Sequence, residues 1–176
     1  FKGPLSALES EERRKILPPE KILREAGLRK GHTIIDFGCG PGFFSIPALE
    51  IVGPSGKVIA IDISQRMIEE ISSRTEGLPN IRIVKGDSLR GFSADIVLAV
   101  NVLHEIDDKK KFFTEAFEAL RNGGKLVIID WQKKETPTGP PVEHRISKEE
   151  AILLAGTKPV EHEINDMFYF LEFPKR

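Results

Sequence analysis

The chain of 176 residues is 40% hydrophobic and 30% charged, with a formal net charge of −1. This composition is typical of a globular protein and leaves room for a full core, so we expect a single domain over 1–176. A net charge so close to zero gives no overall attraction for polyanions, which argues against nucleic acid as a partner. No apolar run reaches the roughly 20 residues that cross a bilayer, and one cysteine cannot form an intrachain disulfide. We therefore expect a cytoplasmic protein that has no membrane partner.

Strands and helices are predicted to alternate from residue 33 onward. Before them lies an arm with a charged stretch over 9–15, a break at Pro18-Pro19 and a short helix ending at Gly27. The predicted strands are 33–37, 57–61, 81–84, 96–100 and 125–131. The predicted helices are 42–52, 65–74 and 107–120, the last of which ends before Asn122-Gly123-Gly124. Such alternation favours a parallel sheet covered by helices on both faces.

The C-terminal part departs from this alternation. After a proline-rich loop come a predicted helix over 147–155 and two extended segments, 160–164 and 167–173. Asn165-Asp166 between these segments indicates an antiparallel hairpin at a sheet edge. The predicted fold class is therefore α/β: a three-layer Rossmann-like sandwich whose mostly parallel seven-stranded sheet has an antiparallel last strand. Its parts are a helical arm (1–30), a ligand-binding core (31–131) and a lid loop, helix and hairpin (132–176).

The strongest local signal is a glycine-rich turn between the first strand and the next helix, which reads Asp36-Phe37-Gly38-Cys39-Gly40-Pro41-Gly42. Glycines adopt backbone conformations barred to other residues and let a ligand approach the chain closely. The following helix would present unpaired amides and a partial positive charge, which suit a carboxylate or a phosphate. A tight turn without any ligand is the alternative interpretation, and Cys39 is expected mainly to fill space inside it.

Two common nucleotide-binding patterns fit this turn poorly. The dinucleotide fingerprint needs a small residue where this chain has Phe43, and the third glycine comes one residue early, at Gly42. A dinucleotide-dependent oxidoreductase would also need a second, substrate-binding half, and so it stays an outside alternative. The P-loop pattern is absent from the sequence, because no Gly-Lys-Ser/Thr follows the turn.

The stretch from Asp36 to Gly42 resembles the D-x-G-x-G-x-G motif of class I S-adenosylmethionine-dependent methyltransferases. The resemblance runs from about residue 22 to 173 and is greatest to the small ubiquinone-biosynthesis-type methyltransferase domains. It implies S-adenosylmethionine as cofactor and methyl transfer as activity. A non-catalytic S-adenosylmethionine-binding module is the alternative from another class. An aminopropyl transferase of the same fold ranks lower, because 100–102 lacks the paired acidic residues that bind a polyamine.

The resemblance also implies how the nucleoside part of the cofactor is held. Asp62, at the end of the second strand, would accept hydrogen bonds from both ribose hydroxyls, and Ile63 and Met67 would flank the adenine. Asp62 could equally act as a charge at a helix N-terminus, with Ser64 as the cap, and both roles can hold together.

Residues after the third and fourth strands would complete the cofactor site. Asp87 would accept a hydrogen bond from the adenine amino group, beside Ser88, and Asn101 would lie near the methionine part. Asp36 would orient the turn or reach the methionine amino group through water. The predicted cofactor residues are Asp36, Gly38, Cys39, Gly40, Gly42, Asp62, Ile63, Met67, Asp87, Ser88 and Asn101.

The candidate general base is His104, since histidine titrates near neutrality and this one follows the fourth strand. A structural histidine at the approach to a helix is the alternative, and the catalytic residues are left unassigned. Glu105, Asp107 and Asp130 rank below His104. The four histidines are scattered without paired ligand spacing, so no metal site is expected.

A small molecule with an oxygen, nitrogen or carbon nucleophile is the expected methyl acceptor. Residues 101–104 lack the Asn/Asp-Pro-Pro-Tyr/Phe motif of amino-methylating enzymes, and the basic runs 13–15 and 109–111 are expected to be solvated faces. The loop 132–145, together with 1–20, is the expected lid over the acceptor, although a surface loop without function is equally consistent with its sequence. A second copy of the chain, in a homodimer, could complete the open site.

Overall fold

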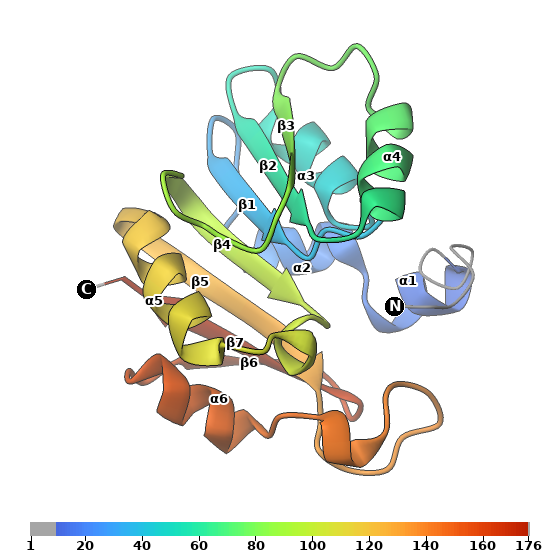
Figure 1. Ribbon diagram of the computed structural model, residues 1–176, viewed down its shortest axis with the longest axis vertical. Helices are drawn as coiled ribbons and strands as arrows, with labels where there is room; N and C mark the ends of the chain where they lie inside the picture. Colours follow the sequence, from blue (N-terminus) through green and yellow to red (C-terminus); the bar gives the residue numbers. More distant parts are fainter. Residues whose placement is uncertain (1–9, 176) are drawn as a thin grey trace. The chain divides into compact units, whose positions relative to one another are not determined.

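The computed structural model describes residues 10–175 (Figure 1). The chain divides into two compact units, Phe1–Asp87 and Ser88–Arg176. Residues 1–9, which belong to the predicted arm and lid, lie outside the described part. The prediction of a single domain stays a prediction.

The first unit contains a parallel sheet of strand order β3-β2-β1. All five residues of β1 are buried, as expected for a strand covered on both faces. The elements, in chain order, are α1 (Glu11–Ile16), α2 (Pro19–Glu25), β1 (Thr33–Phe37), α3 (Ser45–Val52), β2 (Lys57–Asp62), α4 (Gln65–Arg74) and β3 (Ile81–Lys85).

The second unit contains strands in the order β4-β5-β7-β6. β4 is parallel to β5, whereas β7 runs antiparallel to both β5 and β6. Its elements are β4 (Ala94–Val100), η2 (Leu103–Glu105), α5 (Lys109–Ala119), β5 (Leu120–Trp131), η3 (Val142–His144), α6 (Lys148–Ala155), β6 (Val160–Asn165) and β7 (Phe168–Pro174). The seven strands form a mixed α/β Rossmann-like sheet whose last strand is antiparallel, and the predicted fold class is confirmed.

Two predicted boundaries next to glycines are wrong: the start of the helix over 42–52 and the start of the strand over 125–131, which begins at Leu120. α3 begins at Ser45 rather than at 42, because the turn keeps a positive φ (102°) as far as Gly42. α5 ends at Ala119, and the glycine pair expected to follow the helix lies inside β5. A Cβ on Gly124 would come within 2.9 Å of the Asp95 carbonyl, so the glycine permits a close strand approach where the β4–β5 register shifts.

The sequence interpretation missed the first helix of the described chain, α1. Ser10 caps it, since its side chain accepts a hydrogen bond from the Arg13 amide (3.2 Å), and two glutamates occupy its first turn. With only 6 residues, α1 lacks the apolar periodicity by which longer helices are recognised. Within residues 10–175, none of the helices has the length and apolar character needed to span a bilayer.

Candidate functional site

The glycine turn after β1 presents an open backbone on one side and a packed one on the other. A Cβ on Gly40 (φ 54°) would meet no atom within 4 Å, so this part of the turn faces open space. A Cβ on Gly42 (φ 102°) would instead press on Ile46 and Ile71 at 3.1–3.2 Å, which locks this glycine against α3 and α4. Gly40 can therefore admit a ligand, whereas Gly42 serves the packing.

The backbone amides of the turn already have partners inside the unit. The amides of Gly38 and Cys39 donate hydrogen bonds to the Ile61 carbonyl (2.8 and 3.0 Å). The Gly40 amide donates to Asp62 Oδ2 (2.9 Å), and the Gly42 amide donates to the Cys39 carbonyl (3.1 Å). At the start of α3, the Ile46 amide donates to the Gly42 carbonyl, and Pro47 has no N–H. The expectation that this turn and helix offer unpaired amides to an anion is therefore wrong for these donors.

Asp62 lies at the carboxyl end of β2, directly beside the turn. Its two carboxylate oxygens accept hydrogen bonds from the amides of Gly40 (2.9 Å) and Ser64 (2.8 Å), which fixes the orientation of the carboxylate. Each oxygen keeps a further lone pair that can accept a hydroxyl. The Ser64 side chain makes no capping bond, so the carboxylate acts at this helix end in its place.

The two apolar residues predicted to flank an adenine lie in different environments. Ile63 is 70% exposed, although it is a large hydrophobic residue, and it directly follows Asp62. Met67 is only 4% exposed and belongs to the buried core. Ile63 therefore has an exposed apolar surface for a flat ligand, whereas the buried Met67 has little surface left to flank one.

Asp36 is buried at the end of β1 and holds the turn to α3. The Ser45 hydroxyl donates to its carboxylate at 2.6 Å. Burial raises the pKa of Asp36 to about 6, the Ser45 hydrogen bond opposes that rise, and the charge of Asp62 adds to it. Inside the turn, burial raises the pKa of the Cys39 thiol, which rules against a reactive thiolate and fits the predicted space-filling role.

The remaining predicted cofactor residues begin with Asp87, an exposed residue at the end of the first unit. Ser88 and Asn101 belong to the second unit. Ser88 Oγ donates to Glu115 Oε2 (2.8 Å), and Leu89 N donates to the same oxygen (2.8 Å). Glu115 was missed in the sequence, although an acidic residue within the apolar stripe of α5 is a signal for a buried polar contact.

Asn101, directly after β4, combines two unusual features. It has the only positive φ (54°) of a non-glycine residue in the described chain, and its buried Oδ1 has no hydrogen-bond partner among the described residues. Its amide donates to the Ile129 carbonyl at 2.8 Å, which ties the strained residue to β5. A strained backbone and an unpartnered buried acceptor at a strand end are typical of a functional position.

His104 and Asp130 form a side-chain pair in the second unit. His104 Nδ1 lies 2.8 Å from Asp130 Oδ1, and the His104 amide donates to Asp130 Oδ2 at 3.2 Å. The Trp131 amide also donates to Oδ1 (2.8 Å), and the Asp130 side chain is 1% exposed. The carboxylate, which cannot donate, fixes the tautomer with hydrogen on Nδ1 and leaves Nε2 as the acceptor. Glu105 lies at 3.9 Å from Nε2.

The predicted lid segment 132–145 is pinned by its own last residue, Arg145. This buried guanidinium lies 5.2 Å from the Trp131 ring centroid. It donates to four carbonyls of the loop, which belong to Pro140 (2.8 Å), Gln132 (3.0 Å), Lys134 (2.7 Å) and Thr138 (3.4 Å). The loop thus has a defined shape before any ligand binds.

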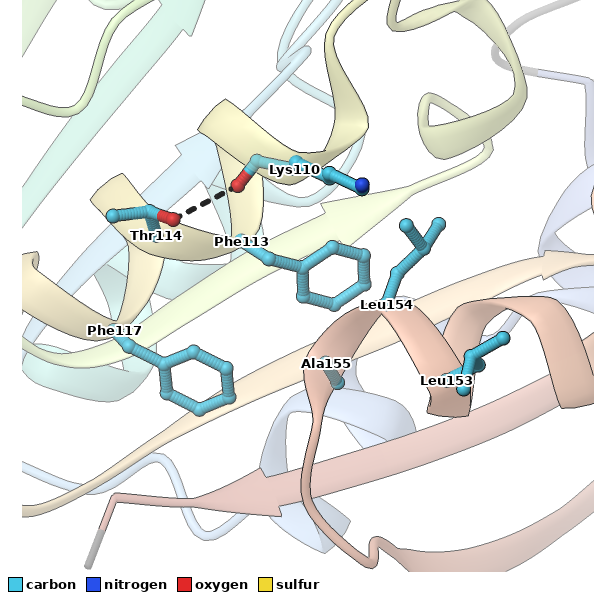
Figure 2. A pocket seen from close by; sticks show the side chains of 7 residues that line it. All are labelled: Lys110, Phe113, Thr114, Phe117, Leu153, Leu154 and Ala155. Carbon is cyan, nitrogen blue, oxygen red and sulfur yellow. Dashed lines mark hydrogen bonds between the residues drawn. The ribbon is translucent and has the colours of Figure 1, made fainter.

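Figure 2 shows an apolar groove between α5 and α6, with a volume of about 530 Å³. Its lining residues are Lys110, Phe113, Thr114, Phe117, Leu153, Leu154 and Ala155. None of them was predicted as a site residue, and Lys110 is the only ionisable one. Within residues 10–175, no group of three potential ligand side chains could hold a metal ion.

Comparison with known proteins identifies relatives of this chain. The family model described as a methyltransferase domain matches residues 28–168. A demethylmenaquinone methyltransferase of Staphylococcus aureus is 29% identical over 122 residues, which cover 67% of this chain and 51% of that protein. The chain therefore spans about half the length of this curated relative.

Solved structures resemble the whole described fold. A SAM-dependent methyltransferase from Aquifex aeolicus has a TM-score of 0.89 at 28% identity, covering 98% of this chain and 97% of the other. A putative type 11 methyltransferase from Sulfolobus solfataricus has a TM-score of 0.74 at 24% identity, covering 90% and 92% of the two chains. The second likeness concerns the fold alone.

Proposed function

The chain belongs to the family of class I S-adenosylmethionine-dependent methyltransferases, and on this premise we propose that it methylates a small molecule whose accepting atom carries a proton at neutral pH. The observation that carries the proposal is the His104–Asp130 pair, which provides a positioned proton acceptor directly after β4. When bound, S-adenosylmethionine supplies a methyl group activated by its sulfonium, so the protein contributes orientation, exclusion of water and proton removal.

The residues of the first unit fit the cofactor. Asp62, oriented by two backbone amides, would accept the ribose hydroxyls, and the exposed Ile63 would cover one face of the adenine. The open side of Gly40 leaves room for a ligand against the backbone. Asp36, Cys39 and Met67 would act from the core by shaping the turn, as would Gly38 and Gly42.

Three further residues are proposed contacts at the ends of later strands. The exposed Asp87 would accept a hydrogen bond from the adenine amino group, with Ser88 beside it. Asn101 would direct its unpartnered Oδ1 toward a donor of the methionine part.

His104 would remove the proton of the acceptor through Nε2. Its Nδ1–H donates to Asp130, whose buried carboxylate stabilises the imidazolium that forms and fixes the ring orientation. The bound cofactor would supply the methyl group to the deprotonated acceptor, and His104 would pass the acceptor's proton on to solvent. This chemistry suits hydroxyls and acidic C–H groups, and the name of the demethylmenaquinone methyltransferase relative supports a small molecule.

A screen for methyl transfer tests the proposal. The purified chain would be incubated with tritium-methyl S-adenosylmethionine and panels of phenols, hydroxyquinones, amines and thiols. We expect label in products from the first two panels, because the acceptors in them carry a proton that a general base can remove. Transfer only to amines or thiols would contradict the role of the base. Tight cofactor binding without transfer to any panel would favour the non-catalytic module.

A cytoplasmic location and a homodimer stay predictions from the sequence. Sedimentation equilibrium of the purified chain measures its mass in solution and decides between one copy and two.

A further inference from the structure

The short helix α1 brings a cation to the glycine turn. The guanidinium carbon of Arg13 lies 4.5 Å from the ring centroid of Phe43, a buried residue that directly follows Gly42. Arg14 approaches the same ring at 5.2 Å but is exposed to solvent. Arg13 is half-buried, so the expectation that the basic run 13–15 forms a solvated face is wrong for this residue.

Arg13 also interacts electrostatically with the acidic end of β1. Burial lowers the pKa of Arg13 to about 10, and the charge of Asp36 opposes that shift. Arg13 in turn lowers the pKa of Asp36, against the effects of burial and of Asp62. Asp36, Asp62 and Arg13 therefore act on one another next to the turn, and Arg13 stays charged at neutral pH.

The methionine part of the proposed cofactor is a zwitterion and needs partners for both charges. Asp36 and Asp62 favour its cationic groups but repel its carboxylate. The amides of Gly38, Cys39, Gly40, Gly42 and Ile46 are engaged within the unit and would have to give up these partners to receive an anion, and Pro47 has no amide hydrogen. A cationic side chain would bind the carboxylate without breaking any of these backbone hydrogen bonds.

Arg74 is another arginine that lies close to the turn. It donates to Glu70 at 2.7 Å and reaches the Pro41 carbonyl at 3.5 Å. It does not figure among the charges that act on Asp36. Arg13, which stacks on Phe43 and acts on Asp36, is the better placed of the two cations.

We propose that Arg13 binds the carboxylate of the methionine part of S-adenosylmethionine, so that α1 is an integral part of the cofactor site. A planar guanidinium can bind a carboxylate through two parallel hydrogen bonds. Because Arg13 already stacks on Phe43, its side chain loses less conformational entropy when the carboxylate binds. This inference rests on the proposed function and adds a residue to its cofactor site.

The test combines a change in the protein with a change in the ligand. Calorimetry would measure the binding of S-adenosylhomocysteine and of its decarboxylated analogue, which keeps the adenosine, the thioether and the amine. Wild type should bind the carboxylate-bearing ligand roughly tenfold to a hundredfold more tightly, as expected for a charge-assisted hydrogen-bonded pair. Arg13→Gln should abolish this preference and bind the two ligands alike.

Arg14→Gln is the matched control, because it also removes one positive charge from α1, and Arg14 lies over the same Phe43 ring as Arg13. It should keep the wild-type preference. Arg13→Lys should keep a smaller preference, since it retains the charge without the planar fork, and it serves if Arg13→Gln does not fold.

Either of two results would overturn the inference: a wild type without preference for the carboxylate, or an Arg13→Gln variant that keeps the preference. If wild type binds neither ligand, the proposed function itself fails, and that outcome differs from both.

Discussion

The glycine turn of the first unit and the His104–Asp130 pair of the second are built in different ways. The turn lies within one short stretch of chain, where glycine conformations and backbone hydrogen bonds to Ile61 and Asp62 set its shape. The pair joins two side chains 26 positions apart, one after β4 and one near the end of β5. A site made of backbone shape leaves a motif in the sequence, whereas a site made of two distant side chains leaves none.

The largest expected effect separates chemistry from binding. His104→Gln should lower methyl transfer by about 10²–10⁴-fold and leave the affinity for S-adenosylhomocysteine unchanged, because it removes only the proton acceptor. Asp130→Asn should lower transfer less and move the pH profile, since the ring loses its fixed tautomer. Steady-state kinetics with an acceptor from the screen, together with calorimetry, measure both quantities.

His144→Gln is the control for that experiment, because His144 is an exposed histidine of the same unit. Its kinetics should match those of wild type. Equal losses of activity and of cofactor affinity in His104→Gln would mean that the pair is structural rather than catalytic.

The next effect distinguishes the two sides of the turn. Gly42→Ala should destabilise the fold by about 2–3 kcal/mol, because the residue adopts a positive φ and its Cβ would press on Ile46 and Ile71. Gly40→Ala should cost about 1 kcal/mol, since only the backbone conformation resists the change. Denaturant unfolding measures these free energies.

Cofactor affinity should respond differently to the same two changes. Gly40→Ala should fold and yet lose affinity for S-adenosylhomocysteine, because its new methyl group occupies the open side of the turn. An unchanged affinity in this variant would place the ligand elsewhere.

A smaller effect concerns pH and the buried Asp36. Its pKa is raised from 3.8 to about 6 in the folded chain, so the folded state holds this proton more tightly than the unfolded state does. The free energy of unfolding should therefore fall as the pH rises from about 4 to about 6, by up to roughly 3 kcal/mol from this group. Asp36→Asn should remove that part of the pH dependence.

Urea unfolding of wild type and Asp36→Asn at pH 4 and pH 7 measures the difference. The variant should gain stability relative to wild type between these two values. A difference that is the same at both pH values would show that Asp36 titrates normally.

Local sequence patterns predicted most of the fold and the acidic strand ends. Asp36 and Asp62 lie at the carboxyl ends of β1 and β2, and in parallel sheets such positions meet at one edge, so their proximity could be predicted from the alternation alone. The glycine pair at 123–124 misled the interpretation, because a glycine that stops a helix and one that lets two strands approach look the same in a sequence.

The parts that could not be predicted depend on contacts between distant residues. The stacking of Arg13 on Phe43 and the hydrogen bonds from Ser88 and Leu89 to Glu115 need the folded chain to be recognised. The hydrogen bonds of the turn amides could not be predicted either, because a glycine motif indicates the path of the backbone but not the acceptors to which its amides donate.

Asp62 is the residue on which the proposed cofactor site depends most directly. Calorimetric titration of wild type, Asp62→Ala and the exposed control Asp166→Ala with S-adenosylmethionine, S-adenosylhomocysteine and NADH tests it. Wild type and the control should bind the first two ligands and not NADH, and Asp62→Ala should lose about a hundredfold or more in affinity, since two hydrogen bonds to a charged group are removed. Binding of NADH, or full affinity in Asp62→Ala, would contradict the account.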